Sequence, residues 1–278
     1  MQTRYGLINV CRAFNKTPQA YYSIKRRQRD QNIRNDAVIK MVQVIRRTHP
    51  YYGLRKLHYT IKQQGFEIGR DALRNLLKQA GLLFKPHLAR LFVKTTDSSH
   101  HFRLYPNLLR NMSVSRPEQV WLADVTFIKI QGLFYYLALV CDAYSRRIMG
   151  WDLQDKNTAD LTCNALTKAY RTRIHPQGPL IHHSDRGIQY CCGTYRMLLH
   201  KLGITVSTTE SGNPKENAIM ERTIRTLKYE FELKKNFQTY QDAYQRIEYA
   251  IDVYNHLRIH LSCKMNTPAT QHLFPLFV

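Results

Sequence analysis

The sequence predicts an α/β protein in which a mixed sheet with flanking helices follows an all-α region. Two observations lead to this prediction. Up to about residue 85, apolar residues recur at spacings of three and four, which is typical of short helices joined by tight turns. From residue 119 onward, strand-like segments alternate with helical ones, and a nearly balanced charge replaces a strongly basic one.

The net charge of the 278-residue chain is +22, and most of it lies in the first half. Residues 1–120 carry 23 Lys and Arg against 6 Asp and Glu, whereas residues 121–278 carry 19 against 14. A protein region with such an excess of positive charge usually binds a polyanion, so the basic half is predicted to be a phosphate-binding region. A basic surface that only keeps the protein in solution is the alternative.

The cysteines and the apolar segments predict where the chain resides. No apolar run approaches the length needed to span a bilayer, and no segment resembles a secretory leader. The 6 cysteines form no C-x-x-C pair and no zinc spacing with histidine, so we expect reduced and mostly buried thiols. We therefore expect a cytoplasmic protein, associated with the bacterial nucleoid, that has no membrane partner.

Four helices are predicted in the basic region, near residues 5–29, 36–48, 54–63 and 70–80. Thr17 and Pro18 fit an N-cap and a first-turn position, and Gly81 fits the end of the last helix. These helices divide into a small helical segment over residues 1–32, itself similar to a helix-turn-helix, and a helix-turn-helix DNA-binding domain over residues 33–85.

The last two of these helices are predicted to bind DNA. Arg70, Arg74 and Lys78 recur at every fourth position, on a face separate from the buried stripe of leucines. A helix, a glycine-containing turn and a second helix with a basic outer face are typical of the helix-turn-helix, whose second helix enters the major groove. Arg55 and Lys56 on the preceding helix are further candidates for DNA contact. The alternative is a plain helical hairpin with a solvated basic face.

A basic linker over residues 86–117 leads to a predicted core over residues 118–235 and a C-terminal helix and tail over residues 236–278. Strands are predicted at 119–130, 133–142, 146–153, 179–184 and 204–208, and helices at 158–172, 190–202, 214–234 and 239–257. Gln131-Gly132 joins the first two strands as a hairpin turn. Three meandering strands followed by helix, strand, helix, strand and helix is the order of the ribonuclease-H-like fold.

Asp124 lies in the middle of an apolar strand, V-W-L-A-D-V-T-F-I-K-I. It shares one face with Leu122, Thr126 and Ile128, and the opposite face is also apolar, as in a central strand covered on both sides. A carboxylate in this position is costly unless a metal ion or a basic side chain compensates for its desolvation. We favour the metal ion.

Two further acidic residues have settings that suit the same site. Asp185 closes a short strand in P-L-I-H-H-S-D-R-G, where a turn-forming aspartate is the alternative. Glu221 lies at the edge of the apolar stripe of a helix and shares a face with Arg225 and Lys228, which are candidates for contact with the DNA backbone. An ion pair between Glu221 and Arg225 is the alternative there. His183 shares the face of Asp185, but a satisfied polar strand end is its preferred interpretation.

Three carboxylates that converge on one point form a site for two Mg²⁺ ions, with Mn²⁺ as a substitute. Asp124, Asp185 and Glu221 are therefore the predicted metal ligands and catalytic residues. Such a site cuts and joins phosphodiesters, and the basic side chains of the chain would bring DNA to it.

The segments around these residues resemble a DDE transposase of the insertion-sequence-three family, in its second-reading-frame catalytic protein with a core similar to that of retroviral integrases. In the core and C-terminal parts these segments are W-L-A-D-V-T-F-I, D-A-Y-S-R-R-I-M-G-W, H-S-D-R-G-I-Q-Y, S-G-N-P-K-E-N-A-I-M-E-R, T-L-K-Y-E, Y-N-H-L-R-I-H and M-N-T-P. In the front half, R-R-T-H-P-Y-Y-G-L-R-K-L resembles the helix-turn-helix of the family. The 35 residues between Asp185 and Glu221 are typical of its spacing. Lys215, Glu216 and Arg222 depart from the usual pattern, which affects details of DNA contact and leaves the three acids intact.

The resemblance implies that Asp124, Asp185 and Glu221 are the catalytic triad of an enzyme that binds the ends of an insertion sequence, cleaves DNA and joins 3′ ends. It also implies double-stranded DNA as partner, homo-oligomers assembled on two element ends, and an upstream-frame protein as partner or fusion. One alternative is a non-catalytic or domesticated DNA-binding protein derived from a transposase. The other is a nuclease that cuts without joining.

Overall fold

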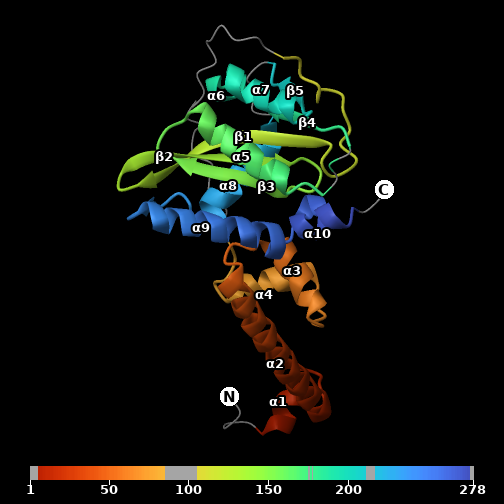
Figure 1. Ribbon diagram of the computed structural model, residues 1–278. Helices are drawn as coiled ribbons and strands as arrows, with labels where there is room; N and C mark the ends of the chain where they lie inside the picture. The colour runs from red at the N-terminus through yellow and green to blue at the C-terminus, as the bar shows by residue number, and fades with distance from the viewer. Residues whose placement is uncertain (1–5, 85–104, 175, 177, 211–216, 276–278) are drawn as a thin grey trace. The chain divides into compact units, whose positions relative to one another are not determined.

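The computed structural model describes residues 6–84, 105–174, 176, 178–210 and 217–275. The chain divides into two compact units, Met1–Leu88 and Ala89–Val278 (Figure 1). None of the described helices is both long and apolar enough to cross a membrane.

Unit 1 contains the helices α1 (Leu7–Ala13), α2 (Pro18–Thr48), α3 (Leu54–Gln63) and α4 (Arg70–Gln79). The Thr17 side chain accepts a hydrogen bond from the Ala20 N–H at 3.1 Å, which confirms the predicted N-cap. The structure corrects the expected break near residues 30–35, because α2 runs through it as one helix of 31 residues. The physical reason is that α2 contains no glycine or proline after Pro18, so nothing interrupts its backbone hydrogen bonds. The boundary expected at residue 32 falls inside this helix.

The end of α2 packs with α3 and α4 around one apolar core. Its fully or nearly fully buried side chains are Val38, Val42, Ile45, Leu57, Ile61, Leu73, Leu76 and Leu77. Gly65 follows α3 with φ of +83°, and Gly81 follows α4 with φ of +68°, the left-handed conformation that ends a helix. The helix boundaries predicted for α3 and α4 are confirmed.

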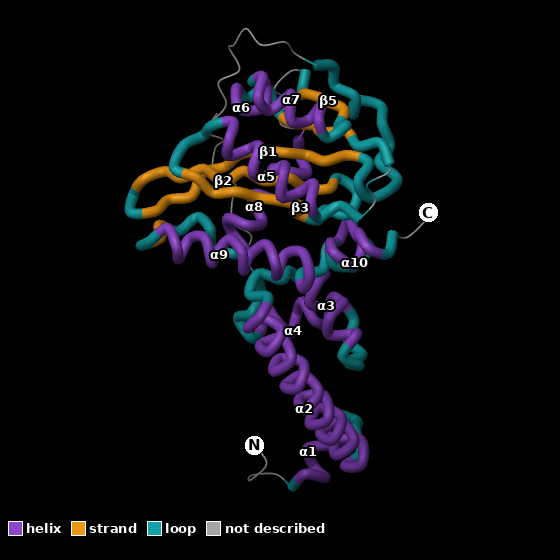
Figure 2. Tube along the Cα trace, in the orientation of Figure 1, coloured by secondary structure: helices purple, strands orange, loops and turns teal. Residues whose placement is uncertain are grey.

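Unit 2 is built on a mixed sheet of six strands (Figure 2). These are β1 (Val120–Ile130), β2 (Leu133–Asp142), β3 (Ile148–Gln154), β4 (Ile181–Ser184), β5 (Thr205–Thr208) and β6 (Asn236–Phe237). The strand order is β3-β2-β1-β4-β5, and β6 pairs with β1 beyond β4. Neighbours pair antiparallel within β1–β2–β3 and parallel elsewhere. The predicted strands and the Gln131-Gly132 turn are confirmed, whereas β6 was missed because two residues carry no periodicity.

The helices of unit 2 are α5 (Ala159–Arg171), α6 (Ile188–Cys191), α7 (Gly193–Lys201), α8 (Ala218–Glu230), α9 (Tyr240–Asp252) and α10 (Pro268–Leu273). A π-helical turn, Val253–Leu257, continues α9. The helix expected at residues 190–202 is interrupted at Cys192, whose ψ of 156° is extended. The helix expected at residues 214–234 is described from Ala218 and ends before Glu232, which has φ of +63°. Its predicted capping residues 213–216 lie outside the described residues.

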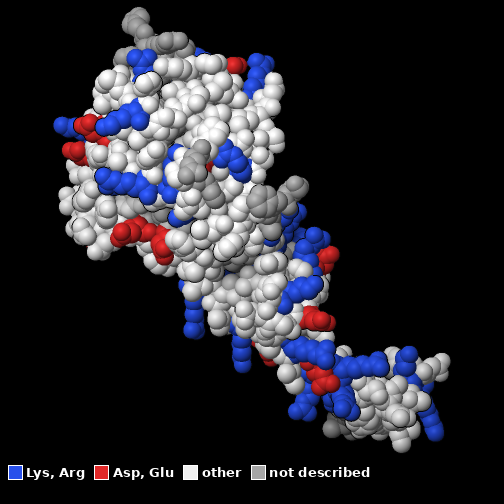
Figure 3. Space-filling view, turned by 45° about the vertical axis from the view of Figure 1, so that its right-hand side comes forward, with Lys and Arg blue, Asp and Glu red and all other residues white. Residues whose placement is uncertain are grey.

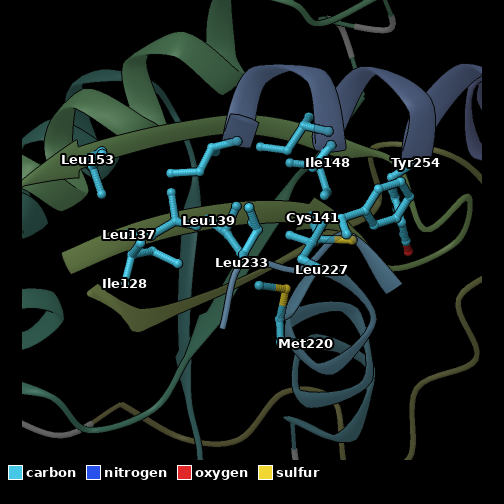
Figure 4. Close-up of a cluster of buried hydrophobic side chains, with 14 of the residues drawn as sticks. Ile128, Leu137, Leu139, Cys141, Ile148, Leu153, Met220, Leu227, Leu233 and Tyr254 are labelled. Carbon is cyan, nitrogen blue, oxygen red and sulfur yellow. The ribbon is translucent and has the colours of Figure 1, made fainter. Parts of the chain in front are cut away.

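The sheet is covered on both faces. One face, with Trp121 and Ala123, packs against α5 and α7, while the other, with Leu122 and Ile128, packs against α8 and α9. Figure 4 shows Met220 and Leu227 of α8 among the strand side chains Leu139 and Cys141. Asp124 belongs to this second face by strand alternation, so α8 and its Glu221 cover the face on which Asp124 lies.

Residues 105–117, expected as linker, pack on unit 2 instead. The Leu108 N–H donates to the Ser207 hydroxyl at 3.0 Å, and the Thr208 hydroxyl donates to the Tyr105 carbonyl at 2.6 Å. Leu109, Met112 and Val114 pack against the apolar core on the α8 side. The apolar side chains in this segment explain the difference, because exposing them would be unfavourable. The rest of the expected linker, residues 86–104, lies outside the described residues.

Candidate active site

Asp124 lies where one edge of β1 has no strand beside it. Along this edge β4 pairs with residues 120–122 and β6 with residues 129–130, and in the described part of the chain no strand lies between them. The Ala123 carbonyl accepts a hydrogen bond from Asn217 Nδ2 at 3.3 Å, and the Val125 N–H donates to Asp124 Oδ1 at 2.8 Å. Side chains therefore satisfy the Ala123 carbonyl and the Val125 N–H on this edge. No described strand covers the edge beside the Asp124 carboxylate.

The sheet register brings Asp185 to Asp124. Residues 120, 121 and 122 pair with residues 181, 182 and 183, so the same register, continued past the end of β4, sets Asp185 level with Asp124 on one face. Asp185 Oδ1 also accepts the Gly187 N–H at 3.0 Å, which is the turn that the alternative interpretation expected. The turn orients this carboxylate and does not remove it from the site.

Glu221 lies on α8, near enough to Asp124 for its negative charge to act on that carboxyl group. Its neighbour Met220 is fully buried against the sheet, and Glu221 itself is half-buried. Burial raises its pKa, and the nearby Arg225 opposes this shift. Among the described residues no ion pair forms between Glu221 and Arg225, so the carboxylate is not occupied by the intrahelical partner that the alternative proposed.

The electrostatics of Asp124 show that the three acids share one environment. Burial, together with the negative charges of Asp185 and Glu221, raises the pKa of Asp124 to about 8. The hydrogen bond from Val125 and the positive charge of Lys228 act in the opposite direction. A carboxyl group with this pKa is only partly ionised at neutral pH, so a bound cation would be needed to keep it fully charged.

The donor set fits a hard divalent cation, because carboxylates supply oxygen ligands and a cation would relieve their repulsion. In the part of the chain that the structure describes, however, no three His, Cys, Asp or Glu side chains lie close enough together to hold a metal ion. The helix that carries Glu221 begins next to residues 211–216, which are outside that part. The three acids thus share an electrostatic environment without forming a closed metal site.

Lys228 faces the strand more than the solvent. Its Nζ atom lies 4.0 Å from the centre of the Phe127 ring, and burial lowers its pKa to about 8 while the charge of Asp124 opposes the shift. Arg225, one helical turn earlier, is exposed. Of the two cations predicted on this helix face, Lys228 therefore balances the charge of Asp124, and Arg225 is open to a ligand.

The basic residues of unit 1 also divide into exposed side chains and one that is buried. Arg70, Arg74 and Lys78 are all exposed on α4, and Arg55 is exposed on α3. Lys56, by contrast, is only 9% exposed, with its Nζ atom 5.0 Å from the centre of the Tyr52 ring. Lys56 therefore packs within unit 1, whereas a residue that contacts DNA would be exposed. Figure 3 shows Lys and Arg side chains over both units on the face it presents.

Four residues have supporting roles, and only His183 among them was singled out from the sequence. Asn217 is buried and precedes Glu221 by four residues, a spacing that places both on one helix face and could have revealed it. Asn255 donates to the Ile148 carbonyl and accepts its N–H, both at 2.9 Å, and so binds the backbone of β3. Arg258 forms a two-pronged ion pair with Glu230 at 2.6 and 2.7 Å, which fixes the end of α8. His183 accepts or donates a hydrogen bond with Ser207 at 2.9 Å, as the preferred interpretation expected.

Comparison with protein families gives two matches in this unit. An integrase core domain matches residues 114–214, and a second integrase core domain matches residues 202–268. Among solved structures, a chain of the simian T-cell lymphotropic virus intasome, in complex with a PP2A regulatory subunit, has a TM-score of 0.50 and 19% identity. The match covers 82% of this chain and 73% of that one. The catalytic core of HTLV-2 integrase, in complex with magnesium, has a TM-score of 0.46 and 20% identity over 56% of this chain and 97% of that one.

Similar sequences come from bacterial insertion elements. A 31 kDa protein of insertion element IS600 from Shigella sonnei is 34% identical over 94% of this chain and 96% of its own length. The transposase of IS904 from Lactococcus lactis is 34% identical over 69% of this chain and 78% of its own. Transposase InsF of IS3A from Escherichia coli is 28% identical over 82% and 80%.

The mixed sheet, its flanking helices and the matched domains define an integrase-core enzyme with a ribonuclease-H-like fold. The long matches to insertion-element proteins identify the family within this class. The chain belongs to the IS3 family of DDE transposases.

Proposed function

We propose that this transposase cleaves the ends of an insertion sequence and joins their 3′ ends to other DNA by metal-assisted phosphoryl transfer at Asp124, Asp185 and Glu221. The observation that carries the proposal is the burial of Asp124 near two other acids, Asp185 and Glu221, which together raise its pKa to about 8. Such a concentration of negative charge is unfavourable in the isolated protein. It suits a site that receives divalent cations together with a phosphate group.

In this mechanism the chain holds the reacting groups in place. Asp124, Asp185 and Glu221 would together hold the ions through their carboxylate oxygens. Two Mg²⁺ ions, or Mn²⁺ in their place, would activate the attacking oxygen and stabilise the leaving oxygen. Lys228 keeps a positive charge beside Asp124, which lowers the cost of bringing a phosphate to the acids.

Cleavage and joining need no external energy source, because each step forms one bond to phosphorus and breaks another. In cleavage, a water oxygen forms a bond to phosphorus, and the bond to the 3′ oxygen breaks, leaving a 3′-hydroxyl. In joining, that hydroxyl forms the bond to a second phosphorus and releases another 3′ oxygen. One phosphodiester is lost and one is gained in the joining step, so its free-energy change is small.

Double-stranded DNA is the partner that follows from this function. We assign end recognition to the exposed cations of unit 1, Arg55, Arg70, Arg74 and Lys78, with α4 as the groove-binding helix of a helix-turn-helix. Arg225 would contact the DNA backbone near the acids. Two element ends must meet for transposition, so the protein would act as a homo-oligomer on DNA, with an upstream-frame protein as partner or fusion, in the cytoplasm.

The test uses labelled DNA that carries both ends of the element surrounding the gene. With Mg²⁺, the wild-type protein is expected to give nicked and then joined products. Asp124→Asn should still bind the ends but give neither product, whereas Asp155→Asn, a matched change at an exposed acid, should behave as wild type.

The other outcomes separate the alternatives. Nicks without joined products from the wild-type protein would identify a nuclease. Binding without any cleavage, in Mg²⁺ and in Mn²⁺, would identify a DNA-binding protein that has lost its chemistry. Undiminished cleavage by Asp124→Asn would refute the assigned site.

A further inference from the structure

The turn between β1 and β2 is held rigidly at one end of the sheet. The Gln131 N–H donates to the Phe237 carbonyl, and Gln131 Nε2 donates to the Gln238 carbonyl, both at 2.9 Å. The Gly132 N–H donates to Asn236 Oδ1, also at 2.9 Å. Figure 2 shows this turn at the end of the sheet, close to the start of α9. The backbone of the turn is therefore fixed by β6 before any ligand arrives.

This rigid turn exposes apolar side chains. Leu133 is 65% exposed, Phe134 is 51% exposed, and Phe127 on the neighbouring strand is 36% exposed. The two phenylalanine rings meet edge to face with centres 4.9 Å apart. Because the hydrophobic effect disfavours such exposure, a clustered apolar tip on a fixed backbone indicates a surface that becomes covered by a partner.

The charges around the tip indicate what this partner is. Lys129 Nζ lies 5.3 Å from the centre of the Phe134 ring, and Lys228 lies over Phe127. Lys234, exposed just before β6, is close enough to lower the pKa of Lys228. The nearby acid Glu232 is paired with Lys235 and Arg246, so it does not offset these cations. An apolar tip with lysines near it complements nucleic acid, which offers both flat bases and phosphates.

We propose that Phe134, supported by the Phe127 ring, forms a wedge that inserts between bases of the DNA held at the catalytic acids. Lys129 and Lys234 would hold the phosphates on either side of it. The inference rests on the proposed function and adds to it a second, base-contacting site on the catalytic unit.

The distance along β1 suits this arrangement. Phe134 pairs across the hairpin with Lys129, which is five residues from Asp124. At about 3.3 Å per strand residue, the separation is roughly 17 Å, or about five base steps. Because side chains alternate along a strand, Phe134 lies on the sheet face opposite Asp124, so a DNA strand that contacts both residues would pass the open edge of β1.

The test measures binding of the full-length protein to two probes in EDTA, so that no cleavage occurs. One probe is a duplex of about 30 base pairs, and the other is the same duplex with a short unpaired bubble. The wild-type protein should prefer the bubble probe, because the unpaired bases of the bubble can stack on the Phe134 ring without the cost of opening base pairs. Phe134→Ala should lower affinity for the bubble by roughly tenfold, while Phe134→Trp retains it.

Salt dependence and a matched variant separate stacking from other effects. Phe134→Ala should leave the dependence of affinity on salt unchanged, whereas Lys129→Ala should reduce its slope by about one and weaken both probes equally. Met197→Ala, at an apolar residue of α7 that is 68% exposed, should change neither.

Three results would overturn the wedge. The first is equal binding of both probes by Phe134→Ala and wild type. The second is an altered oligomeric state of DNA-free Phe134→Ala, which would assign the tip to contact between copies. The third is a large fall in its melting temperature, which would assign the tip to packing within the chain. If the wild-type protein joins DNA ends and one of these results is found, the wedge fails while the proposed function stands.

Discussion

The side chain of Asn217 links the two elements that carry the first and last acids of the site. It is buried, donates to the Ala123 carbonyl beside Asp124, and precedes Glu221 by one helical turn. We predict that Asn217→Ala lowers the joining rate at saturating DNA by about 10- to 100-fold, because small displacements of catalytic groups have effects of this size. Its effect on stability should be about 1 kcal/mol, the contribution of one hydrogen bond.

Asn164→Ala is the matched control for this prediction. Asn164, on α5, also donates one side-chain hydrogen bond, to Asp152 of β3 at 3.1 Å, on the sheet face opposite Asp124. It should lose similar stability and no joining activity. If Asn217→Ala and Asn164→Ala joined DNA at the same rate, Asn217 would have only a structural role.

The sequence singled out the three acids but not Asn217, for a physical reason. A carboxylate within an apolar strand, or at a strand end, contrasts with its neighbours, so Asp124 and Asp185 stand out locally. Asn217 lies among polar residues where Asn213 and Pro214 indicate an earlier helix start. Its importance comes from burial against β1, which is a contact between segments far apart in the chain.

At the scale of elements, the packing of α5 on β3 depends on Gly150. A Cβ atom at this position would overlap the backbone of Ala165 and Ala169. We predict that Gly150→Ala lowers the free energy of unfolding by about 2–3 kcal/mol, because backbone atoms of a packed helix cannot easily move aside. Thermal unfolding measures this change.

Gly193→Ala provides the control, since a Cβ there would meet no atom within 4 Å and φ is not in the left-handed region. At the first residue of α7 it should be neutral or stabilise by up to about 1 kcal/mol. Equal melting temperatures for the two variants would show that α5 shifts to accommodate the methyl group.

The helix α10 is fixed by a buried charge network that should respond to pH. His272 contacts Glu118 at 3.3 Å, the Ser145 hydroxyl at 3.0 Å and Asp142 at 3.8 Å. Burial alone would lower its pKa, and Arg147 opposes protonation as well, but hydrogen bonds to Asp142 and Glu118 outweigh both and raise it. In the native protein, the imidazole thus binds its proton more tightly than in the unfolded chain.

The sign of the pH effect follows from this shift. The stabilisation by protonated His272 is complete below its unfolded pKa of about 6.5, and it is lost as pH rises through the higher native value. His272→Gln should therefore lose about 3 kcal/mol of stability near pH 6 and less near pH 9. His256→Gln, which removes an exposed ion pair with Asp252, should show little change at either pH. A loss that grew with pH would contradict the assignment.

The elements themselves were predictable where local chemistry determines them. Alternation of residues and the Gln131-Gly132 turn define the β1–β2 hairpin, and Gly81 ends α4. The interruption at Cys192 and the two-residue strand β6 depend on tertiary contacts, so no local pattern indicates them. The same limit applies to residues 105–117, whose basic character indicated a linker although their apolar side chains pack on unit 2.

At the scale of the whole molecule, the element order predicted the ribonuclease-H-like topology. This topology explains why Asp124 and Asp185, two of the proposed catalytic acids, lie close together. Asp124 and Asp185 are neighbours only because β1 pairs in parallel with β4, across a chain excursion through β2, β3 and α5. That pairing is a property of the fold class, and it could be expected only once the class was recognised. The first compact unit, Met1–Leu88, lies within the strongly basic part of the sequence.

This division predicts that DNA binding and DNA chemistry respond to different substitutions. The double variant Arg74→Ala, Lys78→Ala removes two exposed cations from α4 in unit 1. It should weaken binding to element ends and reduce the slope of affinity against salt by about two, while cleavage at saturating DNA continues. Asp124→Asn should do the reverse, abolishing cleavage with an unchanged salt slope. Lys201→Ala, a lost cation at the end of α7, controls for charge alone and should have little effect on end recognition. If the α4 double variant bound element ends as tightly as wild type, recognition would lie outside α4, and the helix-turn-helix assignment would be wrong.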